Sequence, residues 1–427
     1  MNLTSKKSVA VFGPMLFLLL SACTNFGGIE SNILATNELA YYPPDLQTIH
    51  QTVFDEVWQT IDTEYIRDDF GGTDWAAVKD EYGPLVETAA SPADFQLLME
   101  EMVAEIPNSG IQVVARQTRI DQSINRPTSI NGVGPYLAVR DGQEDETRLI
   151  VMHVLPGSPA AAAGLQPHDA ILLIDGEEVG IEGGPDALQR LSGPEGSTLQ
   201  LLVRSPEQEP RFVNIVRESV RSQPSELRSY IIPGTNVLYL QFPPHEARSI
   251  INEFAASIER LSNENVSASG IVIDLRVMIG RNRSAITQLL PVFTDGEVII
   301  RNERGELRTI DIAGLSGGLQ ETPPLVLLVG PETAGAAEIF AAALQDSGRA
   351  YVIGQPTRGV VEEFESTFLA NGSQLVMPTS TFILPSNERD LGVSGIEPDL
   401  LLDLSWDEIT SSDDPFIDEA VQHIATQ

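Results

Sequence analysis

Between residues 232 and 403 the chain alternates short, uninterrupted apolar runs with segments of helical character. Such runs are typical of strands buried on both faces, which occur in parallel sheets covered by helices. The expected strands are 237–242, 270–276, 298–302, 325–330, 350–354, 373–378, 381–385 and 395–402, and the expected helices lie near 244–262, near 284–291 and from about 335. This region predicts an α/β core with a mainly parallel sheet.

One of these runs, LVLLVG (325–330), leads through a small-residue turn into the helix-forming segment AAEIFAAAL. Several hydrolases place a serine nucleophile on such a strand–turn–helix corner, beside the free N–H groups of the helix start. Here the turn offers Thr333, Ala334, Gly335, Ala336 and Ala337. The corner predicts an active-site geometry, but it carries no serine.

The N-terminus reads as a targeting segment. Lys6 and Lys7 precede an apolar run (9–20) that is too short, and too interrupted by glycine and proline, to span a bilayer. The following LSAC (20–23) resembles a bacterial lipoprotein processing site, which implies removal of residues 1–22 and lipidation of Cys23. The alternative is an ordinary cleaved signal with an incidental cysteine. Residues 23–45 are expected to form a tether.

Composition narrows the possible partners and excludes an internal disulfide. The chain has 61 acidic and 26 basic residues and a formal charge of −35, which argues against nucleic acid as a partner. A single cysteine cannot form an internal disulfide. No metal-ligand or phosphate-loop motif is present in the sequence, so no metal and no cofactor are expected.

Residues 46–120 are expected to form a helical domain. Apolar side chains from Phe54 to Tyr65 fall at helical spacing. Ser91, Pro92 and Asp94 match an N-cap, a first helical position and a capping partner.

Residues 121–220 are predicted to form a small β-rich module. The expected strands include 132–139, 148–154, 199–205 and 212–218, with an alanine-rich helix after residue 156 and another helix near 187–191. The order of elements and the runs GSPAAAAGL and DAILLIDGEEV resemble a PDZ domain. The resemblance implies that an extended peptide adds as a strand and that the loop Asn131, Gly132, Val133 and Gly134 receives its carboxylate. The alternative is that this groove only packs against neighbouring domains.

The whole arrangement resembles the carboxyl-terminal processing peptidases, or tail-specific proteases. The similarity covers roughly residues 50–425 and includes IDLR, AEIFAAALQDSGRA, VIGQPTRG, NGS and GIEPD. It implies that residues 221–427 form an α/β core of the ClpP/crotonase type. It also implies a family that hydrolyses peptide bonds near protein C-termini with a serine nucleophile, a lysine base and a supporting glutamine.

All three catalytic positions implied by the resemblance carry other residue types. The nucleophile position is Gly335, the lysine position after Thr357-Arg358-Gly359 is Val360, and the glutamine position is Phe364. We expect the two apolar side chains to fill the base pocket with hydrocarbon. Removing a catalytic serine typically lowers turnover by about a millionfold.

Neighbouring motifs also depart from the family pattern. The glycine-rich turn after IDLR reads 277–281 here and keeps one glycine, so Gly280 and Ala336 are the expected oxyanion-like backbone positions. An Asp-Ser-His step of the family reads Asn108-Ser109-Gly110.

Three functional hypotheses follow. The first is an inactive, lipid-anchored protein of the bacterial cell envelope, facing the periplasm or the exterior, that binds extended peptides or protein C-termini. The second is an active serine-type endopeptidase with a displaced nucleophile, for which Thr333 is the candidate. The third is a structural or assembly lipoprotein without a peptide ligand.

Overall fold

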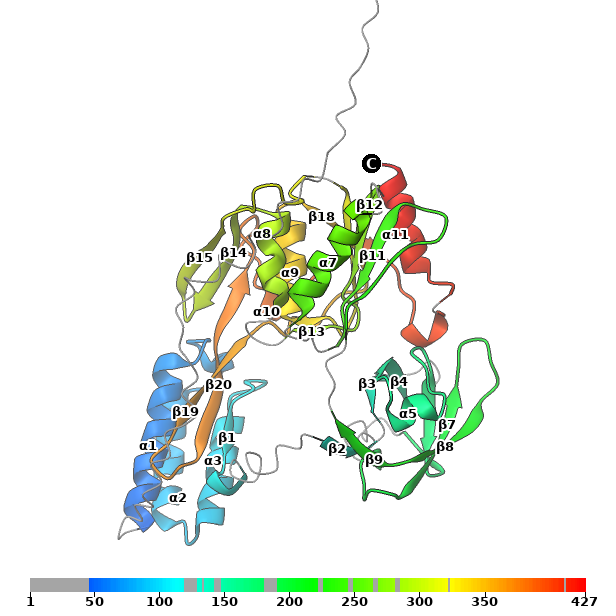
Figure 1. Ribbon diagram of the computed structural model, residues 1–427. Helices are drawn as coiled ribbons and strands as arrows, with labels where there is room; N and C mark the ends of the chain where they lie inside the picture. The colour runs from blue at the N-terminus through cyan, green and yellow to red at the C-terminus, as the bar shows by residue number, and fades with distance from the viewer. Residues whose placement is uncertain are drawn as a thin grey trace, which may run out of the picture.

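A computed structural model describes residues 46–118, 129–132, 134–141, 147–179, 190–221, 226–244, 249–263, 268–280, 285–321, 323–410 and 412–427. The helical segment and the β-rich module lie on opposite sides below the α/β core (Figure 1). The predicted signal, Cys23 and the tether lie outside the described residues, as does most of the helix expected near 187–191. None of the described helices has the length and apolarity needed to cross a bilayer.

The helical segment forms as predicted. Its helices are α1 (Leu46–Glu64), α2 (Trp75–Thr88) and α3 (Pro92–Ala104), with a short 3-10 helix η2 (Phe70–Gly72) before α2. The Ser91 hydroxyl accepts the Asp94 N–H at 3.1 Å and Pro92 opens α3, so the predicted cap is confirmed. Phe54, Val57 and Met99 are at most 1% exposed, because the three apolar stripes face one another.

A hairpin from the C-terminal half completes this segment. Strand β20 (Gln374–Ile383) pairs with β1 (Gln112–Val114) and with β19 (Glu363–Phe368). Leu375 and Met377 of β20 enter the hydrophobic cluster of the helices. The helical unit is therefore not built from residues 46–120 alone.

One prediction, that of two strands between residues 373 and 385, is wrong. Runs 373–378 and 381–385 were expected as two strands, but residues 374–383 form one. The register against β19 shifts beside Pro378, where Glu363 lies opposite Ser380 and Phe364 opposite Pro378. A bulge of this kind accommodates a proline that cannot donate to the ladder.

The β-rich module has the predicted order of elements. Its strands and helix are β2 (Ser129–Gly132), β3 (Pro135–Asp141), β4 (Thr147–Val154), α5 (Pro159–Ala162), β5 (Ala170–Ile174), β6 (Glu177–Glu178), β7 (Thr198–Arg204), β8 (Arg211–Val216) and β9 (Glu218–Arg221). The main sheet has the order β3-β4-β5-β7-β8, β6 pairs with β5, and β2 pairs separately with β9. The Ser158 hydroxyl caps α5 by accepting the Ala161 N–H.

The core sheet has the order β10-β11-β12-β16-β18-β21 and is parallel except for the β10–β11 pair. These strands are β10 (Arg228–Ile231), β11 (Val237–Gln241), β12 (Gly270–Asp274), β16 (Leu325–Val329), β18 (Ala350–Gly354) and β21 (Leu400–Leu401). The mainly parallel sheet is confirmed. Strand β10 was not predicted, and the run 395–402 keeps only two strand residues.

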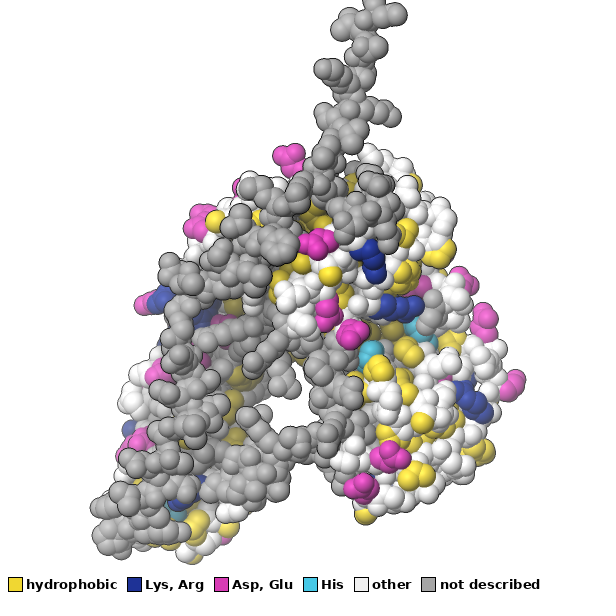
Figure 2. Space-filling view, in the orientation of Figure 1, with side chains coloured by type: hydrophobic (Ala, Val, Ile, Leu, Met, Phe, Trp, Pro, Cys, Tyr) yellow, Lys and Arg dark blue, Asp and Glu magenta, His cyan; other side chains and the backbone are white. Residues whose placement is uncertain are grey.

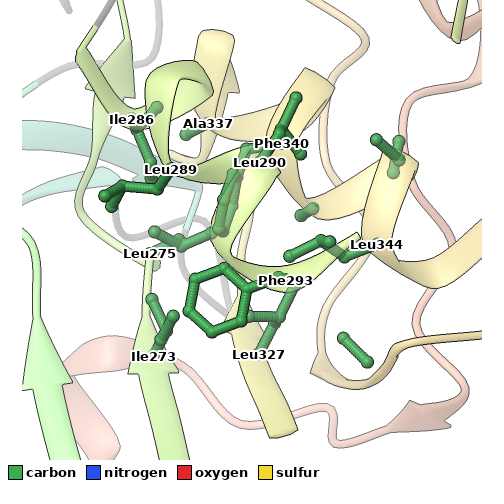
Figure 3. Packing of buried hydrophobic residues seen from close by; sticks show 14 of the residues in the cluster. Ile273, Leu275, Ile286, Leu289, Leu290, Phe293, Leu327, Ala337, Phe340 and Leu344 are labelled. Atoms are coloured by element: carbon green, nitrogen blue, oxygen red, sulfur yellow. The ribbon is translucent and has the colours of Figure 1, made fainter. Parts of the chain in front are cut away.

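Both faces of the core sheet are covered. On one face, Leu238, Ile273 and Leu327 pack against helices α7 (Ile250–Asn263), α8 (Leu290–Phe293) and α9 (Ala336–Asp346). Figure 3 shows Phe293 and Leu327 in this cluster with Phe340 and Leu344 of α9. The other face packs against α11 (Pro415–Ala425) and against the PDZ-like module through Ile150 and Met152.

Smaller elements surround the core. The segment expected as a helix near 284–291 is a 3-10 helix, η5 (Ala285–Leu289), followed by α8. The remaining elements are β13 (Ile279–Gly280), β14 (Gly296–Glu303), β15 (Glu306–Ile312), β17 (Ala334–Gly335), α10 (Leu391–Ser394) and the 3-10 helix η6 (Trp406–Glu408). Strands β15 and β19 were missed because both are polar and mostly exposed, without an apolar run.

His50 makes the helical unit sensitive to acid. Its ring is 2% exposed, stacks on Phe95 at 4.3 Å between centroids, and its Nδ1 has no hydrogen-bond partner in the described part of the chain. Burial lowers the pKa of His50 below its ordinary 6.5. Below about pH 6.5, His50 is therefore protonated in the unfolded chain but stays neutral in the folded chain. The free energy of unfolding falls as the pH drops through this range.

We predict that His50→Leu reduces the pH dependence of the free energy of unfolding by up to about 1.4 kcal/mol per pH unit. Urea unfolding of both proteins at pH 7.5 and pH 5.5 measures the difference. An equal loss of stability in both proteins between these pH values would contradict the role of His50.

Candidate functional site

The predicted corner is present, and Gly335 is its apex. The residue is the N-cap of α9, with φ 62° and ψ −126°. Its N–H contacts the Val360 carbonyl oxygen at 2.8 Å and a carboxylate oxygen of Glu338 at 3.1 Å. The positive φ strains residues with a side chain, so glycine relaxes the turn.

The corner has no room for a side chain at residue 335. Strands β13 and β17 pair in parallel, with Gly280 opposite Gly335. A Cβ atom built on Gly335 would lie 2.0 Å from the carbonyl oxygen of Gly280. The backbone of residue 280 therefore occupies the place into which a nucleophile would project.

The expected oxyanion-like positions, Gly280 and Ala336, do come together. A Cβ atom on Gly280 would lie 2.9 Å from the backbone nitrogen of Ala336 and 2.8 Å from that of Ala337. Gly280 thus lies directly against the first turn of α9, where a substrate oxygen would need free N–H groups. Arg281, the last residue of this turn, lies outside the described residues.

Glu338 organises the corner, a role that the sequence analysis missed. Its side chain is fully buried, and its carboxylate accepts the Gly335 N–H at 3.1 Å and the Gly359 N–H at 2.8 Å. Burial raises the pKa of Glu338, opposed by hydrogen bonds from Thr357, Gly359, Gly335 and Val360. Glu338 is the third helical residue after the N-cap Gly335, and a glutamate at this spacing is the sequence signal that could have identified its role.

The expectation that Val360 and Phe364 fill the base pocket with buried apolar side chains is wrong. Their side chains are 50% and 42% exposed. Val360 turns its carbonyl toward Gly335, and Phe364 lies on the edge strand β19. The Phe364 ring instead contacts Gly110, where an added Cβ atom would be 3.1 Å from two ring carbons.

Thr333 is fully engaged in the structure. Its side chain is completely buried, and its hydroxyl donates to the Leu275 carbonyl and accepts the Gly330 N–H, both at 2.9 Å. These bonds tie the end of β12 to the turn after β16. The hydroxyl therefore has a structural function.

A buried ionic network lies behind the corner, at the end of β12. The Arg276 guanidinium binds Asp274 and Asp414 at 2.7 Å each, and the Tyr239 hydroxyl donates to Asp274 at 2.5 Å. Burial alone would raise the pKa of Asp274, but the Arg276 charge and these hydrogen bonds hold it below its ordinary value. The network was not predicted, because IDLR carries no local signal for a partner as distant in sequence as Asp414.

The network also fixes the PDZ-like module to the core through Trp406 of η6. Arg276 lies over the Trp406 ring at 4.9 Å, and the buried His168 ring stacks on it at 4.2 Å. The Trp406 indole N–H donates to the Val151 carbonyl at 3.2 Å. Beside it, Arg148 binds Asp407 at 2.5 Å.

The proposed carboxylate loop is only partly described. Asn131 and Gly132 end strand β2, and their backbones lie opposite Ser219 and Glu218 of β9. Gly134 has φ 84° and its carbonyl accepts the Leu155 N–H at 3.2 Å. Val133 lies outside the described residues, so the binding role of this loop stays a prediction.

Family models match all three parts of the chain: Tricorn protease C1 domain over 47–104, PDZ domain over 150–205 and Peptidase family S41 over 236–402. The chain is 30% identical over 365 residues to the chloroplastic carboxyl-terminal-processing peptidase 2 of Arabidopsis thaliana, covering 82% of this chain and 68% of that protein. The chain belongs to the carboxyl-terminal-processing peptidase family. The resemblance stated from sequence is thereby confirmed.

Other relatives support this membership. A carboxyl-terminal-processing protease of Picosynechococcus is 27% identical over 388 residues, covering 90% of this chain and 87% of the relative. The solved structure of a photosystem II D1 C-terminal processing protease aligns over 83% of this chain and 93% of its own, with TM-score 0.62 and 23% identity. The helical segment, PDZ domain and α/β core therefore form the family fold.

We predict that Gly335→Ala destabilises the protein by about 1–3 kcal/mol more than Gly348→Ala. Gly348 also has positive φ (69°), but no atom lies within 4 Å of an added Cβ there. The control therefore carries the backbone strain without the contact with Gly280. Urea unfolding measures both variants, and equal losses would show that the corner is open.

Proposed function

We propose that this chain is a catalytically inactive member of the family, which binds extended peptides or protein C-termini through its PDZ domain. The observation that carries the proposal is the closed corner at Gly335. Hydrolysis through an acyl-enzyme requires a nucleophile and a base within hydrogen-bond reach of it. The corner instead holds the Gly280 carbonyl where a side chain would project, and the base position is the hydrocarbon side chain of Val360.

The hydrogen bonds of the Thr333 hydroxyl argue against the alternative in which Thr333 is a displaced nucleophile. An attacking hydroxyl needs a base to accept its proton and space for a carbonyl carbon. The Thr333 hydroxyl donates its proton to a backbone carbonyl inside the core. Freeing it would break two buried hydrogen bonds, which stabilise the turn.

Surface charge is consistent with a peptide rather than a nucleic-acid partner. On the face in Figure 2, Lys and Arg side chains of the described residues occur singly or in small groups, and no extended basic surface is visible. Together with the formal charge of −35, this disfavours polyanionic partners. Peptides bind PDZ domains mainly through backbone hydrogen bonds and a carboxylate, which need no extended basic face.

We further propose that the chain is a lipoprotein of the bacterial cell envelope, anchored through Cys23. The basic residues, short apolar run and LSAC sequence at the N-terminus support this proposal. Several acyl chains on one residue anchor a protein firmly, since each buried methylene contributes about 0.8 kcal/mol.

The inactivity predicts no hydrolysis above the blank. Purified protein is incubated with a reduced, carboxymethylated substrate and with a fluorophosphonate probe, beside an active family member as positive control. We expect neither fragments nor labelling. Cleavage that disappears in Thr333→Val but survives in Thr333→Ser would instead establish an active peptidase.

The anchoring predicts that the protein from a bacterial expression host carries lipid on Cys23. We expect it to partition into the detergent phase and to lack residues 1–22 by mass spectrometry. In Cys23→Ala we expect partitioning into the aqueous phase. Detergent partitioning that is unchanged in the variant would contradict lipidation at Cys23.

A further inference from the structure

In the sheet formed by β1, β20 and β19, one face is buried against the helices, whereas most side chains on the opposite face are at least partly exposed. Side chains alternate along each strand, and Val113, Leu375 and Met377 on one face are buried among the helices. Phe364 and Phe368 belong to the opposite face, because they lie opposite Pro378 and Gln374 in the register. They are 42% and 65% exposed.

Exposed apolar side chains concentrate at this strand. Of eleven large hydrophobic side chains exposed in the described part of the chain, three lie within residues 360–368. Exposed apolar residues scattered over a protein are ordinary, whereas several on one surface mark a binding site. Here the series begins at Val360, two residues after Arg358, and Phe364 and Phe368 lie on the same face of β19.

The outer edge of β19 is open to strand addition. Within the described residues, β20 is the only strand that pairs with β19. An unpaired edge offers a row of N–H and C=O groups, and proteins usually blunt such edges with Lys or Pro. The sequence EFESTF (363–368) contains neither.

The charges on β19 indicate what would occupy its edge. The Glu363 carboxylate forms an ion pair with the Arg301 guanidinium at 2.6 Å. Glu365 is exposed and forms no ion pair in the described part of the chain. Opposite charges across a strand pair stabilise it, and aromatic side chains favour apolar partners. The edge therefore suits an extended segment in which apolar and basic residues alternate.

We propose that the edge of β19 between Phe364 and Thr367 binds an extended polypeptide segment as an added strand, with its apolar side chains on Phe364 and Phe368 and a basic side chain beside Glu365. This inference rests on the proposed function as a peptide-binding protein and names a second contact for the peptide.

The test uses a fluorescein-labelled heptapeptide of alternating leucine and lysine with an amidated C-terminus, so that carboxylate capture by the PDZ domain is not involved. Fluorescence anisotropy measures its affinity for the full chain. The Phe364→Ser, Phe368→Ser double variant should bind at least about tenfold more weakly. Phe212→Ser is the matched control: it removes a 63% exposed phenylalanine from β8 and should leave the affinity unchanged.

Two further arms test charge and backbone pairing. Glu365→Lys should weaken binding of the leucine–lysine peptide and strengthen binding of a leucine–glutamate counterpart. A leucine–lysine peptide N-methylated at the alternate residues whose N–H groups face β19 should not bind, because it lacks the donors for strand pairing. Binding that is unaffected by the β19 substitutions, or equal for the N-methylated peptide, would overturn the proposal.

The free-acid form of the same peptide separates this inference from the proposed function. If the amide binds β19 and the free acid gains no affinity, strand addition stands and carboxylate capture by the PDZ domain fails. If binding requires the free carboxylate and ignores the β19 substitutions, the PDZ domain binds and strand addition fails.

Discussion

The approach of Gly280 to Gly335 is the contact on which the rest of the site depends. Two residues without Cβ atoms allow β13 and β17 to pair across the start of α9. The buried Glu338 carboxylate then joins the same helix start to the segment that follows Thr357. A side chain on either glycine would separate these segments. The two glycines therefore remove a nucleophile and also close the corner.

A second buried arrangement couples the domains. Removing two charges from water is costly, and Arg276 is tolerated in the core because two carboxylates and two aromatic rings surround it. Breaking a buried pair of this kind by removing one partner typically costs about 3–5 kcal/mol. Because Trp406 contacts both Arg276 and His168, the position of the PDZ domain depends on the same network.

Much of the fold could be predicted from sequence, since buried strands and helix caps leave local patterns. The parallel core sheet, the capping by Ser91 and the order of the PDZ strands were all predicted. Strands β15 and β19 were not, because polar exposed strands have no apolar run and exist only through their partners. The hairpin that joins the helical unit comes from the other end of the chain, a contact that no local pattern reveals.

The residue types at the family positions can be read directly from the amino-acid order: Gly335, Val360 and Phe364 supply no hydroxyl, amine or amide. What surrounds these positions in space depends on the folded chain. Val360 and Phe364 were expected to be buried, yet they lie exposed, because Val360 directs its carbonyl inward and β19 forms the edge of its sheet. Residue type is a property of one position, whereas burial and room for a side chain depend on segments such as 277–280 and 108–110 that only folding brings together.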